Sequence, residues 1–264
     1  MDPVKIIFFD IDGTLVDHAT GAISPKTRET LKQLHQQGIL LCIATGRGPA
    51  TLPDFQDLHF DAFCTYNGSL CYTESETIYR NPLHPADVSQ VLKNAAAIGR
   101  PVSVAVRDRL AANGIDQDLA DYYHLAGVEL SVAPDFEQVC KQEIYQMMLG
   151  YRDGQREYIT RETEHTRLAF SWDRAVDVVP ADSSKGVAIE RILQYFHLTP
   201  SQSMAFGDSY NDMEMLQSVG TGIAMGNAPD LLKSVAKDVC GSVSEDGIYH
   251  YCAQHGLITE IPIR

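Results

Sequence analysis

The chain has 264 residues, 44% of them apolar, which is enough to build one large domain or two modest ones around a substantial core. Its 21 basic and 35 acidic residues give a net charge of −14, which argues against binding nucleic acid or an anionic membrane through a broad basic face. No stretch approaches the roughly 20 apolar residues of a membrane span, and the first residues lack the regions of a signal peptide, so we expect a cytoplasmic protein.

Four short apolar runs, each ending in a polar turn, are predicted to be buried parallel strands. They are Lys5–Phe9, Ile39–Ala44, Ala62–Thr65 and Ser203–Phe206. Helical patterns accompany them: one begins at Ser24-Pro25 and stops before Gly38, and two others cover Lys185–Phe196 and Asn211–Val219. Strands that alternate with helices predict βαβ units, and therefore a doubly wound, Rossmann-like parallel sheet of the α/β class.

The middle of the chain mixes helical and strand-like patterns, and prolines at 82, 85 and 180 mark its boundaries. Two helical patterns alternate there with four strand-like runs. The helical patterns are Asp87–Ile98 and Asp118–Ala126. The strand-like runs are Val102–Val106, Ile144–Leu149, Leu168–Trp172 and Val176–Val179. We predict an inserted α+β domain over residues 82–180, and a discontinuous core domain built from residues 1–81 and 181–264.

Two carboxylates, Asp10 and Asp12, follow the first predicted strand directly. They could simply belong to a turn. A calcium loop of the EF-hand type does not fit, because Gly13 would occupy its fourth position and not its sixth. In a third interpretation one acid attacks an electrophile while the other moves a proton, and a hard cation offsets their repulsion. The pattern alone favours catalysis.

The turn Gly207–Asp212 holds Asp208, Asn211 and Asp212 at the end of another predicted strand. One acid would suffice to cap the following helix. Since ligands of such sheets bind beyond the carboxyl ends of the strands, these oxygens should meet Asp10 there. An oxygen-rich cluster suits Mg²⁺, so we favour metal binding over capping.

Thr45, Gly46 and Arg47 follow the second predicted strand and form either an ordinary turn or an anion site at a helix start. Lys185 stands at another helix start, where the helix dipole disfavours a cation. A lysine there would supply the positive charge that a phosphoryl group needs in such an acidic chain. The sequence contains no nucleotide P-loop, no G-x-S-x-G and no H-E-x-x-H motif.

Taken in order, these clusters resemble the four motifs of the haloacid dehalogenase-like superfamily of phosphatases. They are DIDGTLVD from Asp10, TGR from Thr45, Lys185, and GDSYND from Gly207. The sequences IAMGNA from Ile223, Asp246-Gly247 and TYNGS with Asn67 are similar to its Cof-type branch. The inserted segment resembles the α/β (C2-type) cap of that branch in position and length.

The resemblance implies a role for each matching residue. Asp10 would be the nucleophile that forms an aspartyl-phosphate, and Asp12 the general acid and then base, with its backbone carbonyl on the metal. The implied metal site consists of Asp10, Asp12, Asp208 and Asp212. The implied substrate contacts are Thr45, Gly46, Arg47, Asn67, Lys185 and Asn211, with Thr45 and Lys185 on the phosphoryl oxygens. Asp12 also argues against dehalogenation, because dehalogenases of the family lack that acid.

We therefore expect a Mg²⁺-dependent phosphatase for small phosphorylated metabolites, sugar phosphates above all, with flavin or pyridoxal phosphate as other substrates to consider. Two alternatives are a phosphomutase on the same scaffold and a non-catalytic phosphometabolite sensor. Specificity should lie in the inserted domain, whose candidate contacts are Arg107, Arg109, His124, His165 and Arg167. We expect no nucleic acid or membrane partner, and a monomer or small homo-oligomer.

Overall fold

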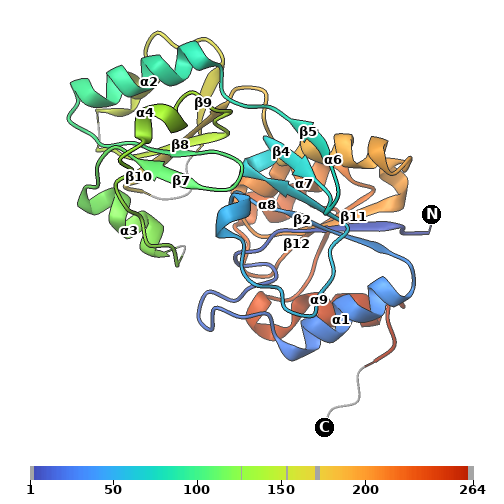
Figure 1. Cartoon of the computed structure of the whole chain (residues 1–264). Coiled ribbons are helices and arrows are strands. Elements are labelled where there is room, and N and C mark those ends of the chain that lie inside the picture. Colours follow the sequence, from blue (N-terminus) through green and yellow to red (C-terminus); the bar gives the residue numbers. More distant parts are fainter. Residues whose placement is uncertain (1–2, 126, 153, 170–172, 261–264) are drawn as a thin grey trace. The chain divides into compact units, whose positions relative to one another are not determined.

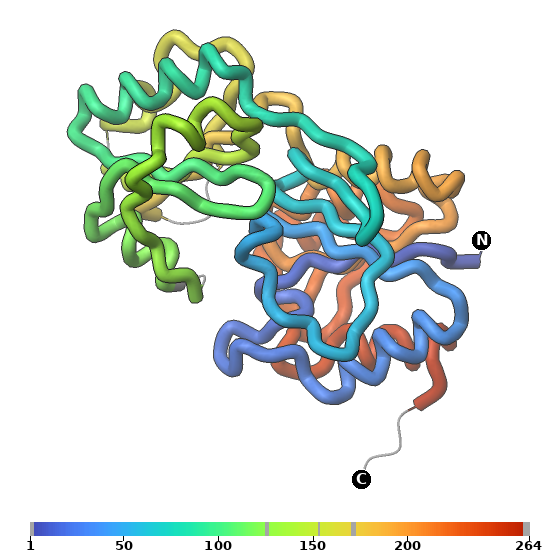
Figure 2. Tube along the Cα trace, in the orientation of Figure 1, coloured from blue at the N-terminus to red at the C-terminus, as the bar shows by residue number. Residues whose placement is uncertain are grey.

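The computed structural model describes residues 3–125, 127–152, 154–169 and 173–260. The chain divides into two compact units: the first contains Met1–Gly46, Asp54–Arg80 and Ser184–Arg264, and the second contains Arg47–Pro53 and Asn81–Ser183. Both ends of the chain build the first unit, as the blue and the orange-to-red parts of the tube show (Figure 2). Within the described residues, no helix has the length and apolar character that crossing a bilayer requires.

An eight-stranded sheet forms the centre of the first unit, counted over the described residues (Figure 1). In spatial order its strands are β13 (Asp238–Val239), β12 (Thr221–Ala224), β11 (Ser203–Gly207), β1 (Ile6–Phe9), β2 (Leu40–Ala44), β3 (Ala62–Thr65), β4 (Leu70–Tyr72) and β5 (Thr77–Arg80). The pairs from β13 to β3 are parallel, whereas β3, β4 and β5 pair antiparallel. The chain thus enters the middle of the sheet at β1, between β2 and β11.

Strand β1 is apolar at every position because both of its faces are covered. Ile6 and Phe8 point into one core cluster, which includes Ile189 of α6 (Lys185–Tyr195) and Met215 of α7 (Met213–Ser218). On the other side, Phe9 stacks on Phe206 at 5.5 Å between ring centroids. Tyr251 of α9 (Gly247–Gln254) meets Phe206 edge to face, and α9 packs beside α1 (Pro25–Gln36). Figure 1 shows these two helix layers, with α8 (Asp230–Val235) next to α7.

Helix α1 begins as its sequence predicts. Ser24 is the N-cap, and its side chain accepts a hydrogen bond from the backbone N–H of Thr27 at 3.1 Å. Pro25 occupies the first turn, where its missing N–H costs nothing. Gly38, just past the end, has φ +79°, a conformation that favours glycine.

The second unit has a five-stranded sheet among its described residues, in the order β7-β6-β8-β10-β9 and antiparallel throughout. Its strands are β6 (Ser103–Ala105), β7 (Leu110–Ala112), β8 (Gln146–Gly150), β9 (Thr166–Ala169) and β10 (Ala175–Pro180). Its helices are α2 (Pro85–Ala97), α3 (Gln117–Leu125), α4 (Phe136–Val139) and α5 (Arg156–Ile159). One apolar cluster, with Val91, Val104 and Val176 among its members, joins helix to sheet.

The predicted fold class is confirmed: a parallel α/β core sheet and an α+β unit are both present. Two parts of the core sheet were not predicted from the sequence: the hairpin of β4 and β5, which makes one edge antiparallel, and the strands β12 and β13 at the other edge. The helix predicted from Asn211 starts as a 3₁₀ turn, Tyr210–Asp212, before α7. The run predicted as Leu168–Trp172 gives β9 up to Ala169, and residues 170–172 lie outside the described residues.

Candidate active site

Three buried carboxylates meet at the carboxyl edge of the core sheet. Asp10 follows β1 and Asp208 follows β11, and these two strands pair in register, with Phe9 opposite Phe206. Asp10, Asp208 and Asp212 each offer an oxygen atom, and these atoms all lie within 4.8 Å of one another. The convergence expected from the strand ends is therefore present in the structure.

Lys185 is the positive charge within this cluster. Ser184 caps α6 by accepting a hydrogen bond from the N–H of Val187, which sets Lys185 as the first helical residue. Its Nζ donates to Oδ1 of Asp10 at 2.7 Å and to Oδ1 of Asp212 at 2.6 Å, and its side chain is fully buried. Burial opposes the charged ammonium, but the two carboxylates outweigh this and raise the pKa of Lys185 above its ordinary value.

One lysine does not neutralise three acids. Burial raises the pKa of Asp10 well above its ordinary value, and attraction to Lys185 offsets only part of that shift. Burial, followed by repulsion from Asp212, raises the pKa of Asp208 to about 6. The site thus has excess negative charge and oxygen donors only, which is the donor set that a hard divalent cation such as Mg²⁺ prefers.

Asp212 shapes the turn that carries Asp208. Its Oδ2 accepts hydrogen bonds from the backbone N–H groups of Asp208 and Ser209, both at 3.0 Å, while its Oδ1 accepts from Lys185. The side chain is 0% exposed. Since both of its oxygens are engaged, Asp212 fixes the positions of Asp208 and Lys185 relative to each other.

The turn after β1 lies against Asp208. Gly13 has φ +85°, and a Cβ at this position would lie 2.2 Å from Oδ2 of Asp208, so only glycine fits. Thr14 is buried and donates a hydrogen bond to Oδ1 of Asp208 at 3.0 Å. Asp12 lies half-buried in the same turn, where it forms an isolated bridge with Val16.

A second group of predicted residues gathers at the ends of β2 and β3. Thr45 is buried, its N–H donates to the carbonyl of Cys64, and its own carbonyl accepts from the N–H of Asn67 at 3.1 Å. Asn67 has φ +52°, and its Oδ1 accepts from Nδ2 of Asn211 at 3.0 Å. A Cβ on Gly46 would lie 3.2 Å from Oδ1 of Asn67. Thr45, Gly46, Asn67 and Asn211 are therefore neighbours.

The start of α6 is brought close to this group by Gly68. This residue has φ +99°, and a Cβ there would lie 2.1 Å from the backbone carbonyl oxygen of Ser184. The absence of a side chain lets the turn after β3 touch the residue that precedes Lys185.

Arg47 falls in the second unit, where its Nη1 donates to the carbonyl of Thr51 at 2.9 Å. Several of the candidate contacts in the inserted segment are also engaged within that unit, among them His165, which lies 3.5 Å from Asp87. Arg109 pairs with Asp135 at 3.0 Å, and Arg167 donates to the carbonyl of Ser183 at 2.6 Å.

Three residues that hydrogen-bond to Asp208 in the structure were not predicted as site residues from the sequence. They are Thr14, Ser209 and Asn227, the last of which donates from Nδ2 to Oδ2 of Asp208 at 3.3 Å and to the carbonyl of Gly13 at 2.9 Å. Thr14 lies within the motif DIDGTLVD, and Asn227 lies within IAMGNA. Membership of these motifs was the sequence signal that could have identified them. The motif Asp246-Gly247 contacts a different part of the unit, the start of α1, where Asp246 accepts a hydrogen bond from Ser24 at 2.6 Å.

The family model for haloacid dehalogenase-like hydrolases matches residues 7–252. The chain is 33% identical over 260 residues to the "Putative phosphatase YkrA" of Bacillus subtilis, covering 96% of this chain and 98% of that protein. It is 29% identical to the HMP-PP phosphatase of Serratia proteamaculans, covering 96% of this chain and 95% of that one. The solved structure of the HAD subclass IIB sugar phosphatase BT4131 superimposes with a TM-score of 0.86 at 26% identity, over 97% of this chain and 100% of that chain.

The match runs through every motif that contributes to the buried cluster, from Asp10 to Asp212. Proteins named as phosphatases resemble the chain over nearly its whole length. The chain therefore belongs to the haloacid dehalogenase-like hydrolases, in its Cof-type branch, and is a phosphoric monoester hydrolase that acts on small phosphorylated molecules.

Proposed function

We propose that the enzyme is a Mg²⁺-dependent phosphatase of small phosphorylated metabolites, with sugar phosphates as the preferred class, and that it works through an aspartyl-phosphate. The observation that carries this proposal is the contact of Lys185 with Asp10, beside a second carboxylate at Asp208 within 4.8 Å. A nucleophile, a fixed cation and oxygen ligands are the parts that phosphoryl transfer requires.

Asp10, Asp208 and the backbone carbonyl of Asp12 would hold the Mg²⁺. Asp212 would keep Asp208 in position through its hydrogen bond to the backbone N–H of that residue. The bound ion would stabilise the negative charge on the transferring phosphoryl group. The oxygen-only donors and the raised pKa values of Asp10 and Asp208 support this assignment, because burial and mutual repulsion disfavour their charged forms and a divalent cation would offset both.

In the first step a carboxylate oxygen of Asp10 would attack phosphorus, and the bond from phosphorus to the ester oxygen would break. Asp12 would give its proton to the departing alcohol. In the second step a water molecule would attack the aspartyl-phosphate and release inorganic phosphate. Asp12 would take the proton of that water, so both carboxylates return to their starting state.

Lys185 and Thr45 would hold the oxygens of the phosphoryl group, and Lys185 also orients Asp10 through their hydrogen bond. Gly46, Asn67 and Asn211 would line the same side of the site, and their mutual contacts support a shared role. Arg47, with the rest of the second unit, would select the leaving group. The sugar phosphate preference rests on the likeness to a sugar phosphatase, and the relatives named HMP-PP phosphatases make HMP-PP the next substrate to assay.

Phosphate release from a panel of phosphorylated metabolites, with Mg²⁺ and with EDTA, tests the proposal. We expect turnover of sugar phosphates with Mg²⁺ and its loss in EDTA. Asp10→Asn should remove nearly all turnover while circular dichroism stays native. Retained turnover in Asp10→Asn would refute the nucleophile, and isomerised sugar phosphate without free phosphate would indicate the mutase. A native protein inert toward the whole panel would favour a sensor.

A further inference from the structure

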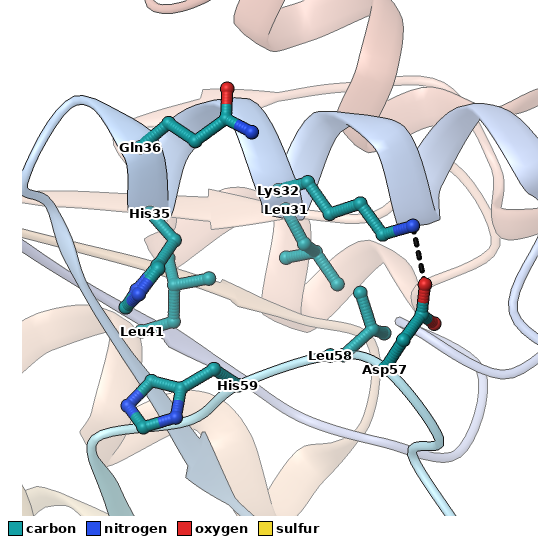
Figure 3. Close-up of a pocket in the computed structure, with 8 residues that line it drawn as sticks. All are labelled: Leu31, Lys32, His35, Gln36, Leu41, Asp57, Leu58 and His59. Carbon is teal, nitrogen blue, oxygen red and sulfur yellow. Dashed lines mark ion pairs between the residues drawn. The ribbon is translucent and has the colours of Figure 1, made fainter.

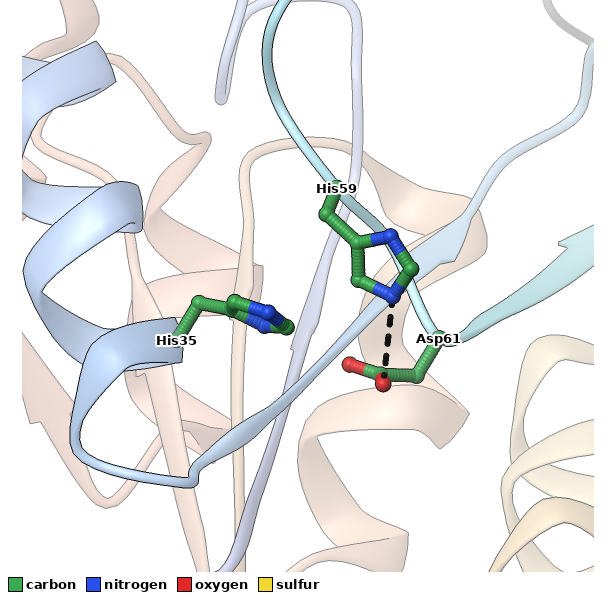
Figure 4. A group of neighbouring side chains, drawn as sticks. All are labelled: His35, His59 and Asp61. Atoms are coloured by element: carbon green, nitrogen blue, oxygen red, sulfur yellow. Dashed lines mark ion pairs between the residues drawn. The ribbon is translucent and has the colours of Figure 1, made fainter.

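A second cluster of metal-ligating side chains lies at the amino ends of the parallel strands, opposite the carboxyl ends that carry Asp10 and Asp208. His35 is in the last turn of α1, His59 lies in the segment before β3, and Asp61 directly precedes β3. Figure 4 shows the two imidazole rings and the carboxylate turned toward one space. Because β2 and β3 are parallel, this cluster lies at their amino ends, whereas Asp10 and Thr45 follow carboxyl ends.

The distances within this cluster suit shared coordination. Nε2 of His59 lies 3.4 Å from Oδ1 of Asp61. One ligand atom from each of the three residues lies within 4.8 Å of the other two. Bonds of about 2.0–2.1 Å in a tetrahedron around Zn²⁺ place neighbouring ligand atoms about 3.3 Å apart. His59 and Asp61 already have that separation, and the ligand atom of the exposed His35 lies within 4.8 Å of both.

Asp61 is held in place for this role. Its Oδ2 accepts a hydrogen bond from the N–H of Leu41 at 2.8 Å, while its N–H donates to the carbonyl of Leu41 at 2.7 Å. Its Oδ1 is the oxygen that faces His59. Anchoring one carboxylate oxygen through the backbone while the other faces the ligand partners is how metal sites fix their ligands.

There is also room for a fourth ligand. His35 and His59 line a hollow of about 110 Å³, whose other lining residues include the ion pair of Lys32 with Asp57 (Figure 3). Since a water molecule takes about 30 Å³ in the liquid, this hollow beside the two histidines has room for a water molecule that could serve as the fourth ligand.

The second unit carries a similar group, His84, Asp87 and His165. There, both oxygens of the buried Asp87 accept backbone hydrogen bonds, from the N–H groups of Glu164 and His165. Because both oxygens of Asp87 are used to hold the backbone at residues 164 and 165, this group is not the candidate metal site. It provides a control for the experiment below.

We propose that His35, His59 and Asp61 form a site for Zn²⁺ or a similar transition-metal ion, distinct from the acid cluster around Asp10. Two imidazoles and one carboxylate are ligands that select Zn²⁺ over Mg²⁺. The bound ion joins the end of α1 to the segment between β2 and β3. It thereby stabilises the amino ends of these strands, on the side of the sheet opposite Asp10.

Isothermal titration with Zn²⁺ tests the site, on protein stripped with EDTA and then saturated with Mg²⁺ to occupy the acid cluster. The wild type should bind one equivalent. His59→Gln and His35→Gln should each weaken binding by more than about tenfold, as loss of a ligand requires. His84→Gln, Asp208→Asn and His124→Gln, an exposed histidine on α3, should keep the equivalent. Visible absorption of bound Co²⁺ gives a second readout that does not depend on turnover.

Two results would overturn the proposal. One is a wild type that takes up no more Zn²⁺ than the His35→Gln/His59→Gln double variant. The other is a zinc equivalent that disappears in Asp208→Asn and remains in the double variant, which would place the ion at the acid cluster. Neither result bears on phosphate release, so the site and the proposed function fail separately.

Discussion

Nζ of Lys185 and Oδ1 of Asp10 lie 2.7 Å apart, although the two residues are 175 positions apart in the chain. The contact joins the start of α6 to the end of β1, and it is fully buried on the lysine side. It stabilises the charged form of Asp10, the proposed nucleophile, and it makes the integrity of the site depend on the packing of the core sheet.

Replacing Lys185 by Met should destabilise the metal-free protein strongly. Asp10 and Asp212 would lose their shared partner in a buried place, and breaking such an ion pair typically lowers the free energy of unfolding by about 3–5 kcal/mol. Urea unfolding in EDTA measures the change. Lys26→Met is the control, because Lys26 pairs with Asp246 at a partly exposed position, and it should cost less than about 1 kcal/mol. Equal effects in the two variants would contradict the buried pair's importance.

Replacing Gly13 by Ala should displace Asp208. The new Cβ would overlap its Oδ2, and the residue would also be strained at φ +85°. We expect turnover to fall by about 100-fold, as a misplacement of about 1 Å in a catalytic group can cost. Steady-state kinetics of Gly13→Ala beside Gly21→Ala tests this. Gly21 also has positive φ, but its Cβ would meet nothing within 4 Å, so that variant should be strained yet retain its turnover.

Replacing Thr14 by Val should weaken metal binding without changing the shape of the side chain. The hydrogen bond from Thr14 stabilises the charged form of Asp208, so its loss should raise the pKa of Asp208 further and make the carboxylate a poorer ligand at neutral pH. Titration of turnover with Mg²⁺ should show a higher half-saturating concentration. Thr30→Val removes a buried hydroxyl within α1 and should leave that concentration unchanged; a shift in both variants would point to a general loss of stability.

The stability of the metal-free protein should fall as pH rises through about 6. Asp208 has a pKa of about 6 in the folded chain against an ordinary 3.8, so the folded state holds its proton more tightly than the unfolded state. Its stabilising contribution is complete below pH 3.8 and is lost through pH 6. Between pH 5.5 and 7.5 in EDTA, the wild type should lose about 1 kcal/mol more than Asp208→Asn. Adding Mg²⁺ at pH 7.5 should restore stability to the wild type, because the ion binds the charged form. Parallel pH profiles in the two proteins would contradict the assignment.

Local patterns in the sequence were sufficient to predict four central strands of the core sheet, β1, β2, β3 and β11, together with several helices and the residue types of the site. β1 and β3 could be read from short apolar runs, because a strand covered on both faces must be apolar at successive positions. Asp10 and Asp208 could be placed near each other, because parallel strands end at one edge. The β4–β5 hairpin could not, since Thr77–Arg80 is an exposed edge with no such pattern.

The tertiary structure alone decided which groups touch. Asp212 contacts Lys185, while Thr14 and Asn227 reach Asp208, and His35 approaches His59. Each of these contacts joins residues from different elements of the fold. The charge state of a buried carboxylate has the same origin, since desolvation and neighbouring charge shift its pKa and both follow from packing. The sequence determined which chemical groups the two ends of the parallel strands carry, and packing determined how those groups share protons and charge.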